Sequence, residues 1–275
     1  MLSDARALEG LSPYLVATPA LQARLTERPL GLAVPRGHCF DPTRRASAPF
    51  LSRLEQLDQV VSGPLAMAMP RWAFYDCAEL PGLVCGFASS AGSVPERLRE
   101  VWPLEARNGP VPLSMCMAVP MLQRDRWLAY VLCDLHEALP GATPPPLRIP
   151  SLALACDLTG ARRMQGVTQW SSSKLAALAS FAPLSLRAAW VPAHSVPATC
   201  VVEFDAGAAA IADALAAPQR ELAARPRWLD VGDPSALEML QRELEAGAEP
   251  SILGAPRRRG GSRVVPLSPE AWEPA

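Results

Sequence analysis

The sequence predicts an α/β protein with a mixed, mostly antiparallel central sheet and flanking helices. Residues 165–204 place a strand, a short helix and two further strands in close succession. Residues 113–135 read as two apolar strand-like runs around a polar turn, which is typical of a hairpin. Hydrophobic residues make up 49% of the 275-residue chain, which is ample for a folded core.

The beginning of the chain predicts little regular structure before one helix. Prolines recur through the first thirty residues and interrupt regular elements, so we expect this segment to wrap the domain irregularly. Apolar residues then recur at helical spacing over 48–61. Ser47 is placed to cap this helix, and Pro49 fits its first turn.

Two hairpins are predicted next. Aromatic and apolar residues flank a Pro-Gly turn between the arms 71–80 and 82–89. The second hairpin has arms 113–122 and 126–135, which are joined by a polar turn. Residues 94–101 can form a short helix between the two hairpins.

The pattern then alternates between helix and strand. The expected elements, in order, are a helix within 151–164 that ends at Gly160 or continues as a frayed turn, a strand over 165–170, a helix over 174–181 capped by Ser171 or Ser172, and strands over 184–192 and 198–204.

The end of the chain predicts a helical extension. An alanine-rich run over 206–217 and an amphipathic run over 234–246, with Asp233 as its N-cap, provide two helices. Because these residues include few large apolar side chains, we expect the extension to pack on the main domain. The expected domains are 1–205 and 206–275.

Charge argues against nucleic-acid and membrane partners. The net charge of -1 gives no general attraction to phosphate backbones or anionic lipids. No apolar run approaches the roughly 20 residues of a spanning helix, and the N-terminus lacks the basic start of a secretory signal. We therefore expect a cytoplasmic protein. The arginine cluster at 257–263 falls in residues that we expect, from Gly254 onward, to be a mobile, solvated tail.

The seven cysteines predict neither a disulfide framework nor a zinc site, because their number is odd and no C-x-x-C pair occurs. No metal is expected. Five cysteines lie in apolar, strand-like runs, where a reduced thiol behaves as a small hydrophobe: Cys77, Cys85, Cys116, Cys133 and Cys200. Arginine almost replaces lysine, and alanine and proline are abundant, which a high-GC bacterial genome would explain.

The order of elements from Trp127 to Phe204 resembles the second half of the GCN5-related N-acetyltransferase fold. In that family two neighbouring parallel strands splay apart, and acyl-CoA enters the gap. The resemblance covers roughly residues 70–205 and makes 126–135 and 165–170 the two splayed strands. It implies an N-acyltransferase that uses acetyl-CoA or another acyl-CoA and acts on a small-molecule or protein amine.

The resemblance also implies cofactor contacts. The family has an Arg/Gln-x-x-Gly-x-Gly/Ala pattern after the first splayed strand, and its amides bind the pyrophosphate at a helix N-terminus. Gly141 and Ala142 match the end of that pattern. With Cys133 on the first splayed strand, they are the expected cofactor-binding residues.

Candidate catalytic and cleft residues come from strand ends and loops. His194 is a candidate general base because imidazole titrates near neutral pH, although it could equally hydrogen-bond a turn. Asp76 would share a strand face with Trp72 beside a cleft. Gln169 and Trp170 end the second splayed strand where an acceptor cleft would open, and the alternative for Trp170 is that it fills the bottom of the splay.

A second function stays open. The helix over 174–181 has no tyrosine, the residue that often protonates the leaving thiolate in the family. Cys133, Tyr130 or a water molecule could replace it. The alternative is a non-catalytic descendant of the fold that binds a small molecule or a protein partner.

Overall fold

A computed structural model of the chain describes residues 8–25, 34–65, 68–70, 82–90, 92, 94, 109–138, 146–191, 199–216 and 226–268. The chain forms two compact units, Met1–Ala161 and Arg162–Ala275, called unit 1 and unit 2 below. The predicted domain limits, 1–205 and 206–275, differ from the limits of these two units and stay a prediction.

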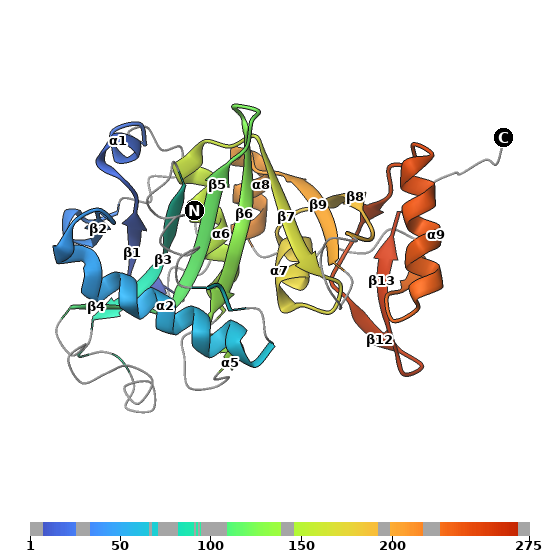
Figure 1. Cartoon of the computed structure of the whole chain (residues 1–275), viewed down its shortest axis with the longest axis horizontal. Helices are drawn as coiled ribbons and strands as arrows, with labels where there is room; N and C mark the ends of the chain where they lie inside the picture. The colour runs from blue at the N-terminus through green and yellow to red at the C-terminus, as the bar shows by residue number, and fades with distance from the viewer. Residues whose placement is uncertain are drawn as a thin grey trace. The chain divides into compact units, whose positions relative to one another are not determined.

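The strands of unit 1 pair in the order β6-β5-β3-β1-β2, with β4 beside β3 (Figure 1). All these pairs are antiparallel except β1 with β2. The strands are β1 (Leu11–Val16), β2 (Cys39–Phe40), β3 (Leu83–Ser90), β4 (Pro110–Pro112), β5 (Ser114–Pro120) and β6 (Arg126–Asp134). The helices are α1 (Pro19–Gln22), α2 (Ala48–Ser62), α5 (Leu135–Ala138) and α6 (Arg148–Thr159), with short 3-10 turns at Arg36–His38, Arg45–Ser47 and Gly63–Leu65.

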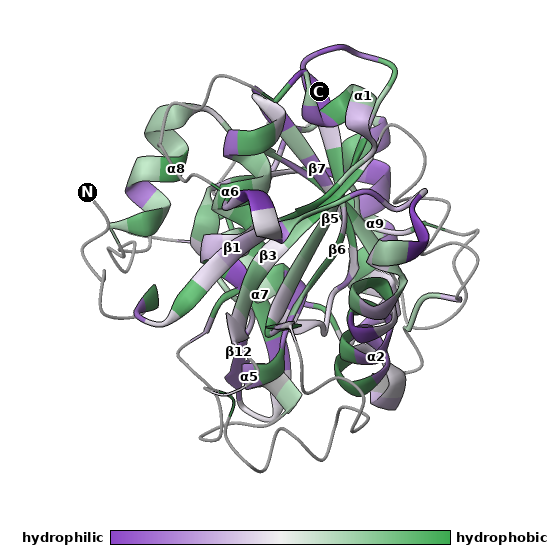
Figure 2. Cartoon of the chain, turned by 90° about the vertical axis from the view of Figure 1, so that its left-hand side faces the viewer, coloured by the Kyte–Doolittle hydropathy of each residue, from purple (hydrophilic) through white to green (hydrophobic). Residues whose placement is uncertain are grey.

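Helices cover both faces of the unit 1 sheet. Figures 1 and 2 show α2 and α6 on opposite sides of the strands, and α6 packs against β3, β5 and β6. Residues 83–89 of β3 are therefore all buried, whereas a sheet with one solvated face would show alternating burial. Figure 2 also shows hydrophilic and hydrophobic residues mixed around α2, as expected for a helix with one packed face.

A group of hydrogen-bonded side chains ties the core of unit 1 together. The Tyr14 hydroxyl donates to the carbonyl oxygen of Ser114 at 2.7 Å, and Ser151 Oγ donates to Ser114 Oγ at 2.8 Å. Gly86, the residue opposite Tyr14 in β3, makes room for this contact, since a Cβ there would lie 2.2 Å from the Ser114 oxygen. Burial raises the pKa of Tyr14 well above its usual value, and nearby cysteine thiols add to the shift.

The strands of unit 2 pair in the order β10-β13-β11-β8-β9-β7, with β12 beside β13. The register places β9 between β7 and β8, antiparallel to both. The strands are β7 (Arg163–Gln169), β8 (Leu184–Ala188), β9 (Thr199–Asp205), β10 (Arg227–Asp230), β11 (Ser251–Ile252), β12 (Arg257–Arg259) and β13 (Ser262–Leu267). The helices are α7 (Ser173–Phe181), α8 (Ala208–Leu215) and α9 (Pro234–Glu245).

The predicted fold class is confirmed at the level of an α/β protein with a large, mixed, mostly antiparallel sheet and several helices. The predicted second hairpin is β5 with β6. Ser172 caps α7 by accepting from the Leu175 amide at 3.2 Å, and Gly160 ends α6 in the left-handed conformation, with φ of 60°. Ser47 precedes α2 but makes no capping bond through its side chain, because its own backbone is already helical.

The expectation of an irregular N-terminal wrap is wrong for residues 11–16, which form β1. This strand pairs with β3 along its whole length. Pro13 has no N–H to donate to a second neighbouring strand. This is tolerated because β2 pairs only with Leu15 and Val16, so at Pro13 β1 has β3 as its single neighbour.

The expectation of a mobile tail from Gly254 and of a purely helical extension is also wrong. Residues 257–267 form a hairpin of β12 and β13, and β10 and β11 join the same sheet, so this part of the chain contains four strands as well as α8 and α9. Gly260 and Gly261, with φ of 55° and 88°, supply the two positive values that a two-residue turn of type I′ requires. This turn explains why an arginine run continues as an ordered strand.

Two predicted elements, the arm 71–80 and most of the helix 94–101, lie outside the described residues. The helices that the structure describes include none that is both long and apolar enough to cross a bilayer.

Candidate functional site

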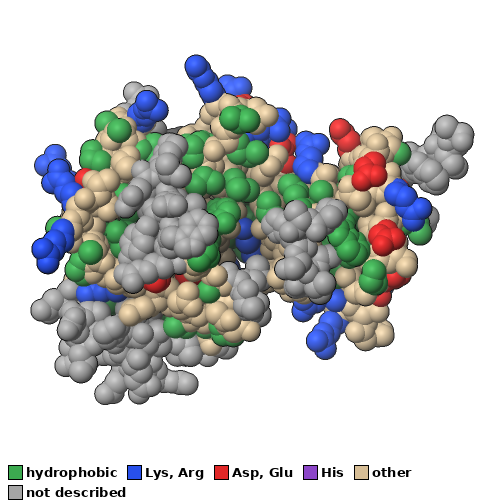
Figure 3. Space-filling model, in the orientation of Figure 1, with side chains coloured by type: hydrophobic (Ala, Val, Ile, Leu, Met, Phe, Trp, Pro, Cys, Tyr) green, Lys and Arg blue, Asp and Glu red, His purple; other side chains and the backbone are tan. Residues whose placement is uncertain are grey.

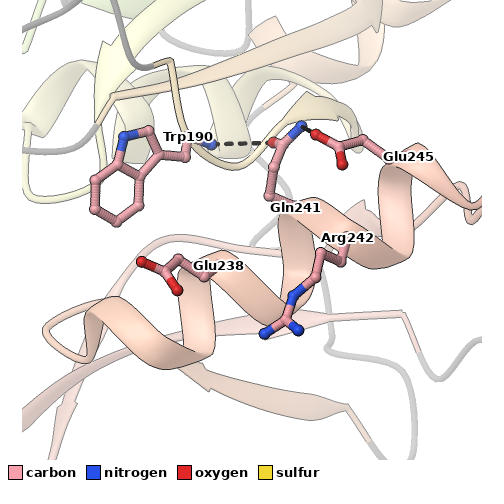
Figure 4. A pocket seen from close by; sticks show the side chains of 5 residues that line it. All are labelled: Trp190, Glu238, Gln241, Arg242 and Glu245. Atoms are coloured by element: carbon pink, nitrogen blue, oxygen red, sulfur yellow. Dashed lines mark hydrogen bonds between the residues drawn. The ribbon is translucent and has the colours of Figure 1, made fainter.

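The part of unit 2 that the structure describes contains a pocket of about 360 Å³, near the lower end of the size range of ligand sites (Figure 4). It lies between α9 and Trp190, which stands just after the end of β8. We call it the Trp190 pocket. Its lining residues are Trp190, Glu238, Gln241, Arg242 and Glu245.

Helix α9 supplies one wall because its sequence separates an apolar stripe from a polar one. Asp233 caps the helix by accepting from the Ser235 amide at 2.9 Å, and Pro234 occupies the first position. Leu237 and Leu240 are buried against the sheet side of the helix. The four helical pocket residues follow at the spacing i, i+3, i+4 and i+7, which places them on one polar face.

Gln241 holds the exit of β8 against this face. Its Oε1 accepts from the amides of Ala189 at 2.9 Å and Trp190 at 3.3 Å, and its Nε2 donates to Glu245 Oε1 at 3.0 Å. Figure 4 shows the indole of Trp190 and the carboxylate of Glu238 on the same side of Gln241, with Glu245 on the other side. The bonds of Gln241 therefore fix the backbone from which Trp190 projects.

The chemistry of the pocket favours a cation with an apolar part. An indole face attracts ammonium and guanidinium groups, and Glu238 and Glu245 add two carboxylates against the one guanidinium of Arg242. Figure 3 shows acidic side chains along α9 at the molecular surface. An amine or guanidinium ligand could thus contact the ring and a carboxylate together.

Trp170 contacts the backbone next to the pocket without lining the pocket. This predicted cleft residue is 2% exposed, and its indole N–H donates to the Ala189 carbonyl oxygen at 2.8 Å. Ala189 is thereby held from one side by Trp170 and from the other by Gln241. Trp170 is therefore a core residue, and the alternative that it fills the bottom of a splay stays a prediction. Gln169, which pairs with Thr199, is half-buried and does not line the pocket.

Among the other predicted site residues, the structure describes Cys133, which lies in unit 1. Cys133 is buried on β6 opposite Met115. His194, Asp76, Trp72, Gly141 and Ala142 lie outside the described residues. Within the described ranges, no group of three or more histidine, cysteine or acidic residues could hold a metal ion.

The N-terminus of α6 is bound by Asp134, a residue at the end of β6. The residues that the resemblance assigns to the pyrophosphate, Gly141 and Ala142, lie outside the described residues. The carboxylate of Asp134, at the end of β6, accepts from the amides of Leu147 at 2.7 Å and Arg148 at 3.2 Å. The Arg148 guanidinium lies 3.7 Å from its other oxygen. Asp134 is fully buried, so a carboxylate of the chain itself occupies the anion position of this helix.

These contacts disfavour a second anion at the N-terminus of α6. The two amide protons that would meet a phosphate oxygen are already donated, and a second anion would face the buried carboxylate. Comparison of the chain with protein-family models and with curated proteins gives no match, and no family follows from them.

Proposed function

We propose that this protein is a non-catalytic binding protein on an acyltransferase-like scaffold, and that its Trp190 pocket binds an organic cation. The single observation that carries the absence of acyl transfer is the buried Asp134 carboxylate at the N-terminus of α6. The ligand class follows from the indole and the two carboxylates of the pocket.

The scaffold part of the proposal rests on the order of elements. The chain has the element order β6, α6, β7, α7, β8 and β9, which resembles the second half of the GCN5-related N-acetyltransferase fold. Within the sheet, β9 lies between β7 and β8. The two strands that the resemblance expects to splay apart are β6, which belongs to unit 1, and β7, which belongs to unit 2. The splay of these strands therefore stays a prediction. Fold-level likeness suggests ancestry, while the site decides function.

Calorimetric titration with butylammonium, butylguanidinium and uncharged butanol tests the ligand class. We expect saturable heat with both cations and none with butanol, because only the cations gain both the ring and the carboxylate contact. The double variant Glu238→Gln/Glu245→Gln should abolish this heat. Arg242→Gln removes a positive charge that would repel a cationic ligand, so this variant should bind the cations as well as the parent protein or more tightly.

Equal heat from butanol, or unchanged cation binding in the double variant, would contradict the proposal. Gln at position 245 keeps an acceptor for the Gln241 amide, so the folded structure should survive, and thermal unfolding checks this. In the same instrument, acetyl-CoA and longer acyl-CoAs should give no heat.

A second candidate is the acyl-CoA-dependent N-acyltransferase, favoured by the same order of elements. For this function the Trp190 pocket would accept the amine, and the cofactor would have to bind without the two amides that Asp134 occupies. Saturable acetyl-CoA binding together with acetylation of an amine probe would select this candidate over the first.

A further inference from the structure

The hairpin of β12 and β13 carries the densest positive charge of the described chain. Residues 251–268 contain four arginines and neither lysine nor an acidic residue. The arginines are Arg257, Arg258, Arg259 and Arg263. We call these four side chains the arginine ribbon. Figure 3 shows basic side chains at the lower edge of the molecule, where Figure 1 places β12.

The register distributes this charge over both faces of the ribbon. Arg258 lies directly opposite Arg263, so these two side chains share one face. Arg257 and Arg259 point to the other face, since neighbouring residues of a strand alternate. On that face Arg259 lies over the ring of Trp228, 4.4 Å from its centroid, and anchors the hairpin to β10.

The ribbon is not neutralised within the described part of the protein. Other arginines pair with carboxylates there, such as Arg187 with Glu203 at 2.8 Å and Arg227 with Glu243 at 2.6 Å. None of the four ribbon arginines forms such a salt bridge with a described residue. The Arg263 guanidinium donates to the uncharged carbonyl oxygen of Ser171. Opposed like charges destabilise a hairpin, and no carboxylate of the described residues forms a salt bridge that would offset the repulsion between Arg258 and Arg263.

We propose that the arginine ribbon binds the phosphate backbone of double-stranded nucleic acid without sequence preference. A two-stranded ribbon fits the major groove of a duplex, and guanidinium groups on both of its faces can reach phosphates on either wall. Uniform positive charge complements a uniformly negative backbone, whereas protein surfaces mix both signs. The earlier expectation of no nucleic-acid partner treated these arginines as a solvated tail, and the ordered hairpin removes that premise.

Fluorescence anisotropy with a labelled DNA duplex of mixed sequence tests the proposal. Arg257 and Arg258 can contact phosphates, and so can Arg263 through the N–H groups that it does not donate to Ser171. With three contacts and a slope of about −0.9 per contact, binding should weaken about 40-fold between ~50 and ~200 mM salt. Arg257→Gln/Arg258→Gln should weaken binding at least ~10-fold and flatten this slope to about −1, because one such contact remains. The matched control Arg45→Gln/Arg124→Gln removes the same charge from exposed positions of unit 1 and should change binding little.

Stability separates a binding role from a structural one. Arg258→Gln removes a like-charge opposition, so the variant should unfold at the same or a higher temperature at low salt while binding DNA less well. Equal loss of binding in both double variants, or absence of duplex binding at low salt, would overturn the proposal. Tighter binding of polyglutamate than of the duplex would overturn it in favour of an acidic protein partner.

Discussion

Two glycines in strands, Gly86 and Gly166, should differ in how well they tolerate substitution by alanine. A Cβ at Gly86 would lie 2.2 Å from the backbone oxygen of Ser114 and 2.9 Å from the Tyr14 hydroxyl. A Cβ at Gly166 would lie 2.7 Å from Leu178 Cδ1, the mobile end of a side chain. We expect Gly86→Ala to lower the free energy of unfolding by about 3 kcal/mol and Gly166→Ala by about 1 kcal/mol or less, measured by urea denaturation.

Gly37→Ala is the matched control, because no atom lies within 4 Å of its added Cβ, and its stability should stay near that of the parent protein. Similar losses in Gly86→Ala and Gly166→Ala would mean that β3 and β5 can separate locally. The close approach at Gly86 would then have no role in the Tyr14–Ser114 contact.

At the level of elements, the turn of the arginine hairpin makes a separate prediction. Gly261 has φ of 88° and Gly260 has φ of 55°. Asparagine adopts the left-handed region readily, whereas alanine costs ~1 kcal/mol or more there. Gly260→Asn should therefore leave the hairpin intact. Gly261→Ala should speed hydrogen exchange at the amides of β12, and equal protection in both variants would contradict the type I′ assignment.

The elements predicted from sequence are those with strong local signals. α7 and α9 carry both a capping side chain and a helical apolar pattern, and the hairpin of β5 and β6 has a polar turn between apolar arms. β1 and the β12–β13 hairpin were not predicted, because a proline and an arginine run respectively argue against strands locally. Long-range pairing, with β3 for β1 and with β10 for β13, decided their conformation.

The candidate site was less predictable than the fold. The polar face of α9 can be read from helical spacing, but its partner Trp190 lies 51 residues before Gln241 in the sequence. No local motif links the two. The sequence predicts Trp170 as a cleft residue, but its side chain is buried and holds the backbone of Ala189, the residue before Trp190. The sequence also contained the clue at Asp134, an acidic residue that ends a strand before a helix, but its bonds to Leu147 and Arg148 required the folded chain.

At the scale of the whole molecule, buried weak acids predict a loss of stability at alkaline pH. Burial raises the pKa of Cys200, in unit 2, from 9.0 to about 12, and burial also raises the pKa of Tyr14, in unit 1. Because the folded-state pKa exceeds the unfolded one, stability is complete below about pH 9 and falls as the pH rises toward 12. Each such group contributes a slope of about 1.4 kcal/mol per pH unit above its own unfolded-state pKa, which is 9.0 for Cys200 and 10.0 for Tyr14.

Melting temperatures measured between neutral pH and the alkaline window check this prediction, with one variant for each unit. Cys200→Ala and Tyr14→Phe should each be less stable than the parent at neutral pH, because they lose buried contacts and the Tyr14 bond to Ser114. Each should nevertheless lose less stability on going to alkaline pH, since the ionising group is gone. Cys39→Ala, at a half-buried cysteine, is the control and should follow the parent's pH profile. If the Cys200→Ala and Cys39→Ala proteins show the same alkaline loss as the parent, the thiol of Cys200 ionises as readily in the folded protein as in the unfolded chain, and its buried placement on β9 is wrong.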